Sequence, residues 1–118
     1  MAGVKELSTQ ELKQWIDDKN DFVLLDVLAA ESYQARHVPT AKSVPVGDSD
    51  FTEKAQALIP DKDTPVVAYC SSSQCGASPR AAGMLADVGY TSVYHYKDGL
   101  AGWQNAGYAF EGEAGPPL

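Results

Sequence analysis

The cysteine at position 70 is the side chain of this chain best placed to do chemistry. Cys70 directly follows the apolar segment 65–69, which is typical of a strand buried on both faces. The residues after it are small and polar, and Ser78 followed by Pro79 is typical of a helix N-terminus. Loops that lead from strand ends into helices bind ligands in open parallel sheets. We therefore expect loop N–H groups and the helix dipole to form an anion cradle around the Cys70 sulfur, which would favour the thiolate and make it a nucleophile.

The loop after Cys70 supplies the other candidate site residues. Its candidate substrate-binding positions are Ser71, Ser72, Ser73, Gln74, Cys75 and Gly76. Cys75 could resolve a sulfenic acid or persulfide on Cys70 by forming a disulfide, or it could be a loop residue that faces away from the site. The spacing of the two cysteines is not Cys-x-x-Cys, so it adds no support of its own for a thioredoxin-type protein.

Size and charge exclude several classes of protein. A chain of 118 residues fits one domain with one core, and its 16 acidic and 9 basic residues leave a net charge of −7. We expect no nucleic-acid partner, because this charge repels a phosphate backbone, and no membrane span, because the apolar runs are too short. The N-terminus has no signal-peptide pattern, so we expect a cytoplasmic protein with reduced thiols. We also expect a monomer. With only His37 and His95 to join the two cysteines, we do not expect a structural zinc site, and we expect no metal.

Strands alternate with helices along the chain. Strands are expected at 22–27, 65–69 and 91–96, with a short extended piece at 43–46, and helices at 9–18, 29–36, 51–59, 79–88 and 100–106. Ser8 and Glu11 form a capping box at the start of the first helix. The alternation predicts an α/β fold, an open and mainly parallel β-sheet with helices on both faces. This domain spans 1–112 and is followed by a loose tail at 113–118.

Short motifs in both halves of the chain resemble those of the rhodanese-like family in their order and spacing. They are Leu24-Leu25-Asp26-Val27, Glu31, Tyr33, His37-Val38-Pro39, Ala41 and Val44-Pro45, then Val67-Ala68-Tyr69-Cys70, Ala81-Ala82, Leu85, Gly89-Tyr90, Val93, Gly99, Trp103 and Ala106-Gly107-Tyr108. The resemblance covers roughly residues 5–112. It implies a rhodanese-like fold and a sulfurtransferase. In such an enzyme Cys70 accepts sulfane sulfur as a persulfide and passes it to a thiol or cyanide acceptor, without a cofactor.

The chain also departs from that family pattern. Leu28 and Arg36 replace the family's arginine and glycine, and the loop between Cys70 and Ala81 is longer than in common single-domain members. No basic residue lies between Ser71 and Pro79, whereas the related phosphatases and arsenate reductases use an arginine there to bind their oxyanion. We therefore expect neither of those activities. Thiosulfate, a dianion, should bind weakly, and a persulfide or a sulfur-carrying protein is the favoured donor.

Two other functions stay open. One is a non-catalytic rhodanese-like binding or sensing module, and the other is a dithiol redox protein that uses Cys70 and Cys75. Three further polar residues are assigned structural roles: Asp26 is expected to pin a turn or cap a helix, His37 to pack and hydrogen-bond, and His95 to lie on a sheet face.

Overall fold

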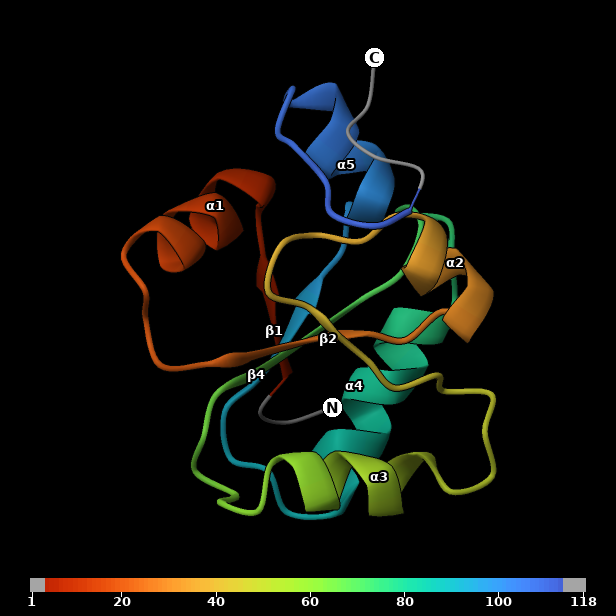
Figure 1. Ribbon diagram of the computed structural model, residues 1–118. Helices are drawn as coiled ribbons and strands as arrows, with labels where there is room; N and C mark the ends of the chain where they lie inside the picture. Colours follow the sequence, from red (N-terminus) through yellow and green to blue (C-terminus); the bar gives the residue numbers. More distant parts are fainter. Residues whose placement is uncertain (1–3, 114–118) are drawn as a thin grey trace.

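A wholly parallel sheet forms the centre of the computed structural model, which describes residues 4–113. Its strands lie in the order β1-β5-β4-β2-β3, so that β4 is central (Figure 1). Their bounds are β1 Val4–Leu7, β2 Val23–Asp26, β3 Lys42–Ser43, β4 Val66–Tyr69 and β5 Val93–Tyr96. Each adjacent pair of strands is parallel, which confirms the expected α/β fold with an open, mainly parallel sheet.

Helices cover both faces of this sheet. They are α1 Thr9–Asp17, α2 Ala30–Ala35, α3 Phe51–Leu58, α4 Ala77–Asp87 and α5 Gly99–Asn105. Buried residues of α3 and α4 belong to one hydrophobic cluster, whereas those of α1 and α5 belong to the other. Figure 1 shows α3 and α4 together, away from α1 and α5. The expected two-sided covering of the sheet is therefore confirmed.

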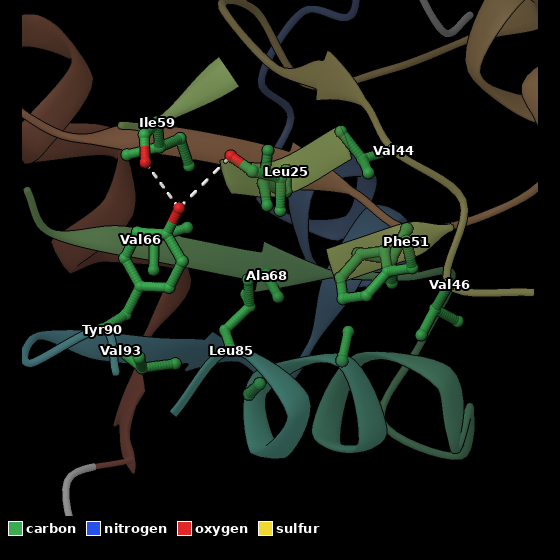
Figure 2. Close-up of a cluster of buried hydrophobic side chains, with 14 of the residues drawn as sticks. Leu25, Val44, Val46, Phe51, Ile59, Val66, Ala68, Leu85, Tyr90 and Val93 are labelled. Carbon is green, nitrogen blue, oxygen red and sulfur yellow. Dashed lines mark hydrogen bonds between the residues drawn. The ribbon is translucent and has the colours of Figure 1, made fainter. Parts of the chain in front are cut away.

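Strand β4 connects the two cores because its side chains alternate between them. Ala68 and Cys70 lie in the core next to α3 and α4, where Phe51 and Leu85 pack (Figure 2). Tyr69 lies in the opposite core. The complete burial of this segment places Cys70 inside the protein at the carboxyl end of the central strand, with none of its surface exposed.

The first helix begins as its sequence predicts. The Ser8 hydroxyl oxygen accepts a hydrogen bond from the Glu11 N–H at 3.1 Å, and the Glu11 carboxylate accepts one from the Ser8 N–H at 3.0 Å. The first strand, in contrast, was not predicted. The residues of β1 alternate poorly, with charged Lys5 and Glu6 in the middle, because β1 is an edge strand with one neighbour, β5.

The C-terminal segment is described only in part. The tail predicted at 113–118 lies outside the described residues except for Glu113, whose N–H donates to the carbonyl oxygen of Gln34 at 2.8 Å. Within 4–113, no helix is long and apolar enough to cross a membrane.

Candidate active site

Cys70 and Cys75 form a disulfide. Their Cα atoms are 6.4 Å apart, within the range that a disulfide spans without backbone movement. Cys70 is fully buried, whereas Cys75 is half-buried in the loop above it. The expectation of two reduced thiols is therefore wrong for this structure, because the loop after β4 folds back and brings the second sulfur onto the first.

The loop does not form the predicted anion cradle in this state. The N–H groups of Gln74 and Cys75 donate to the hydroxyl and carbonyl oxygens of Ser72, at 3.3 and 3.1 Å. The backbone atoms that approach the Cys70 sulfur are instead carbonyl oxygens, those of Ser72 at 3.9 Å and Cys75 at 3.7 Å. The Cys75 sulfur is bonded to Cys70 here, and the N–H groups of Gln74 and Cys75 close a tight turn on Ser72 instead of donating to the Cys70 sulfur.

The other predicted loop residues line the surface rather than the sulfur. Ser71, Ser73, Gln74 and Gly76 are exposed, and Ser72 is half-buried. The structure therefore brings Cys75 and the carbonyl group of Ser72 to Cys70, and leaves most of the loop side chains in solvent.

Ser78 lies closer to the Cys70 sulfur than any of these loop backbone atoms. Helix α4 begins at Ala77, so Ser78 lies inside its first turn and is not the N-cap that the sequence predicted. Ser78 is fully buried, and its hydroxyl oxygen lies 3.2 Å from the Cys70 sulfur and 2.7 Å from Nε2 of His95. A buried hydroxyl group therefore links the cysteine to an imidazole.

The start of α5 holds the backbone of the site. The N–H of Leu100 donates to the carbonyl oxygen of Cys70 at 3.1 Å, and the N–H of Ala101 donates to that of Ser71 at 2.9 Å. Gly99, with φ of 60°, lies so close to both carbonyl groups that a Cβ atom there would overlap them. The turn into α5 therefore requires a glycine at this position.

The loop at 71–76 contains no basic residue. A surface hollow bordered by Ser72, Ser73 and Gly102 also includes the carboxylate of Asp98. Arg80 points elsewhere, since its guanidinium group donates to the carbonyl oxygen of Val46 at 3.3 Å. Between residues 4 and 113, no three His, Cys, Asp or Glu side chains are grouped as metal ligands would be. The chemistry available to this site is that of sulfur, hydroxyl and imidazole groups.

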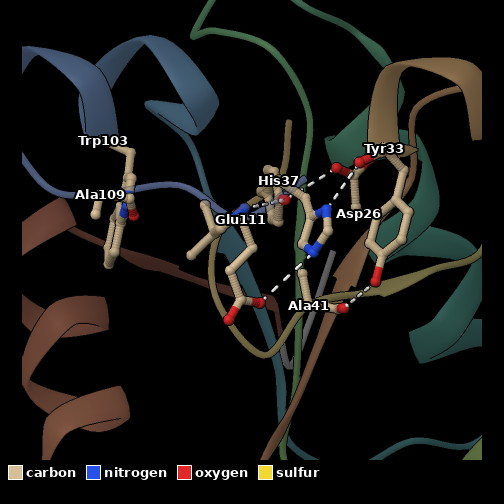
Figure 3. Close-up of polar contacts among 9 residues, drawn as sticks. Asp26, Tyr33, His37, Ala41, Trp103, Ala109 and Glu111 are labelled. Atoms are coloured by element: carbon tan, nitrogen blue, oxygen red, sulfur yellow. Dashed lines mark hydrogen bonds and ion pairs between the residues drawn. The ribbon is translucent and has the colours of Figure 1, made fainter. Parts of the chain in front are cut away.

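Asp26 and His37, which belong to the family motifs and are drawn in Figure 3, have the structural roles predicted for them. The Asp26 carboxylate accepts a hydrogen bond from the N–H of Leu28 at 3.0 Å and so pins the turn after β2. Burial raises the pKa of this carboxyl group. His37 stacks on Tyr33 and lies 3.6 Å from the Glu111 carboxylate, so it ties the end of the described chain to α2 (Figure 3). Neither residue has a hydrogen bond to the cysteine loop among the described contacts.

Tyr69 joins the central strand to two other segments. Its hydroxyl group donates to the Asp26 carboxylate at 2.9 Å and accepts a hydrogen bond from the N–H of Val38 at 3.0 Å. Tyr69→Phe leaves the Val38 N–H and one oxygen of the Asp26 carboxylate without this partner in the core, while the other oxygen keeps its bond from Leu28. We therefore expect the free energy of unfolding to fall by about 2–4 kcal/mol in urea denaturation. The matched control is Tyr94→Phe, since the described residues include no hydrogen-bond partner for that hydroxyl group; it should change stability by less than about 0.5 kcal/mol. Equal losses in the two variants would contradict this role.

Fold and site together define an α/β domain with a cysteine at the end of its central strand, and the comparisons with known proteins agree. The rhodanese-like domain family matches residues 8–106, so the chain belongs to the rhodanese-like family. The thiosulfate sulfurtransferase PspE of Escherichia coli is 33% identical over 69 residues, which cover 58% of this chain and 62% of PspE. The HTH-type transcriptional regulator Rv0324 of Mycobacterium tuberculosis is 32% identical over 90 residues, which cover 76% of this chain but 38% of the regulator.

Solved structures show the same fold. The BH2092 protein of Bacillus halodurans superimposes with a TM-score of 0.83 at 26% identity, covering 94% of this chain and 79% of that one. A thiosulfate sulfurtransferase of Pseudomonas aeruginosa superimposes with a TM-score of 0.81 at 25% identity, covering 92% of this chain and 20% of that one. The similarity thus extends over nearly the whole chain but spans less than two thirds of PspE and of the regulator.

Proposed function

We propose that this protein is a sulfurtransferase in which Cys70 carries sulfane sulfur as a persulfide. The observation that carries the proposal is the position of Cys70, at the carboxyl end of the central strand in a rhodanese-like domain. Relatives named as thiosulfate sulfurtransferases, PspE and the GlpE of Pseudoalteromonas translucida, support the same reaction class. No cofactor is needed, since the cysteine itself is the carrier.

The proposed transfer has two displacement steps. The Cys70 thiolate attacks the sulfane sulfur of a donor, a new S–S bond forms, and the donor leaves as its thiolate or, from thiosulfate, as sulfite. An acceptor thiolate or cyanide ion then attacks the outer sulfur of the persulfide. The S–S bond breaks, the acceptor keeps the transferred sulfur, and Cys70 leaves as a thiolate. In the persulfide state we expect the N–H groups of residues 71–76 to reopen toward the outer sulfur.

We also propose a resolving role for Cys75 in this cycle, which its disulfide with Cys70 supports. When no acceptor is present, the Cys75 thiolate attacks the inner sulfur of the Cys70 persulfide, and the outer sulfur leaves as hydrogen sulfide. The sulfane sulfur gains two electrons and the two cysteines lose them, which yields the disulfide seen here. A small thiol or dithiol reductant must then reopen the disulfide before Cys70 can react again, since the bonded sulfur is buried.

The charges around the site favour some donors over others. The loop has no basic side chain, Asp98 borders the adjacent hollow, and the net charge of the chain is −7. The thiosulfate dianion gains nothing from this field, whereas a thiol persulfide carries less charge. We therefore propose a small persulfide or a sulfur-carrying protein as the donor.

Intact-mass measurement tests this function directly. The Cys75→Ser variant, incubated with a low-molecular-weight persulfide, should gain the mass of one sulfur atom, and the Cys70→Ser variant should gain none. The reduced wild-type protein should instead lose two hydrogens and release hydrogen sulfide. If Cys75→Ser acquires no sulfur from either a persulfide or thiosulfate, the sulfurtransferase proposal is overturned.

A second candidate function is a dithiol redox or sensing role. The Cys70–Cys75 disulfide favours it, as does the similarity to a protein named as a transcriptional regulator. In that case reduced wild-type protein would form the disulfide with a mild disulfide oxidant, while the Cys75→Ser variant would take up no sulfur. The mass experiment therefore separates the two functions.

A further inference from the structure

We propose that Ser78 and His95 form a proton relay that removes the proton from the Cys70 thiol. The proposal concerns the cysteine on which the proposed function depends, but its test needs no sulfur transfer. It starts from the two contacts of one buried hydroxyl group: the Ser78 oxygen is 3.2 Å from the Cys70 sulfur and 2.7 Å from Nε2 of His95. None of the Ser78 surface is exposed, so these groups are the partners of its hydroxyl among the described residues.

The direction of proton movement follows from the chemistry of the three groups. Once the disulfide is reduced, the Cys70 thiol donates to the Ser78 oxygen, and the Ser78 hydroxyl donates to Nε2 of His95. The thiol proton moves to the serine oxygen while the serine proton moves to the imidazole. The products are a Cys70 thiolate that accepts a hydrogen bond from Ser78, and a His95 imidazolium. No oxidant or reductant is involved in this step.

His95 connects the buried sulfur to solvent. It is half-buried and borders a surface hollow with Val4, Glu6, Pro79 and Gly83, whereas Cys70 has no exposed surface. A proton accepted by His95 can therefore leave to water in this hollow. The relay gives the proton of the buried Cys70 thiol a route to solvent, which the thiol itself does not contact.

The surroundings of His95 keep it able to accept a proton. Burial lowers the pKa of the imidazole, and Lys97 lowers it further, while Glu6 on the neighbouring strand raises it. The other neighbouring strand places uncharged Ala68 in register with His95. At neutral pH the imidazole is therefore neutral and can act as the acceptor. As the pH falls through the pKa of His95, the imidazole becomes protonated and the relay stops.

The test measures alkylation of Cys70 by iodoacetamide as a function of pH. Its background is Cys75→Ser, which leaves Cys70 as the one cysteine in the chain. In that background His95→Gln keeps a side chain that can hydrogen-bond to Ser78 but cannot take up a proton. We expect alkylation at pH 7 to slow by about tenfold and the midpoint of the pH profile to rise by about one pH unit. Ser78→Ala should produce the same change, because it removes the link.

The matched control is His37→Gln, which alters the other histidine, one with no contact to Ser78 among the described hydrogen bonds. It should leave the midpoint of the profile in place. Circular dichroism of each variant checks that the fold is retained. If His95→Gln does not fold, Ser78→Ala tests the relay in its place. A His95→Gln profile with an unchanged midpoint overturns the relay, even if the rate falls equally at every pH. That result would leave the sulfur transfer proposal untouched, since the mass measurement tests it separately.

Discussion

Cys70→Ser is expected to lower kcat/KM for sulfur transfer by about three orders of magnitude or more. The serine hydroxyl group occupies nearly the same space next to Ser78, but it neither forms a stable persulfide nor ionises near neutral pH. The assay uses a low-molecular-weight persulfide as donor, with cyanide as acceptor and thiocyanate as the measured product. The loss of kcat/KM should therefore reflect the missing sulfur nucleophile and not a change of fold.

Cys75→Ser is the matched control for that experiment, because each variant removes one sulfur of the same disulfide. Both should lose a similar amount of stability, about 2 kcal/mol for so short a loop. Cys75→Ser should still transfer sulfur to an added acceptor and should release less hydrogen sulfide when none is added. Transfer that survives in Cys70→Ser would contradict the assignment of the sulfur carrier, and transfer lost only in Cys75→Ser would move that assignment to Cys75.

Gly99→Ala is expected to destabilise the protein by roughly 2–5 kcal/mol, the largest stability effect that we predict for a single methyl group. Two costs combine. An alanine must adopt φ of 60°, and its Cβ would lie 2.9 Å from the carbonyl carbon of Ser71 and 3.0 Å from that of Cys70. Neither backbone group can move without breaking the hydrogen bonds that α5 donates to them. Urea denaturation measures the loss, and sulfur transfer should fall in parallel as the loop after Cys70 shifts.

Two other glycines separate these costs. Gly107 has φ of 81°, but a Cβ atom added there would meet no other atom within 4 Å, so Gly107→Ala measures the backbone conformation alone. Gly47 has open space and no positive φ, and Gly47→Ala should change stability by less than about 0.5 kcal/mol. The expected order of destabilisation is Gly99, Gly107, Gly47. If Gly99→Ala is no more destabilising than Gly107→Ala, the proposed contact between α5 and the cysteine loop is wrong.

Much of the fold could be predicted because local patterns determine it. The apolar segments around Leu24 and Val67 became β2 and β4, since only a strand in the middle of a parallel sheet buries every side chain. The Ser8–Glu11 capping box marked the start of α1 for a similarly local reason, two hydrogen bonds within one turn. Edge strand β1 has no such signal, because an edge strand needs little burial.

The partners of Cys70 could not be predicted in the same way. Ser78 followed by Pro79 is typical of a helix start, yet α4 begins at Ala77, two residues before Pro79. This shift turns the serine from a cap into a contact of the sulfur. His95 reaches Ser78 from 17 residues further along the chain, through the register that pairs it with Ala68. That register has no marker in the sequence. The alternation of tyrosine and histidine around it was compatible with either face of the sheet.

From its amino-acid order alone, the chain determined an α/β fold and the position of a single cysteine at the end of a buried strand. Both depend on hydrophobic periodicity and on hydrogen bonds between near neighbours. Only the folded structure decided that Cys75 bonds to Cys70, that two loop N–H groups donate to Ser72, and that Ser78 contacts both the sulfur and His95. These contacts depend on how distant segments pack and on the path of a polar loop, because small polar residues have no strong preference for one backbone conformation.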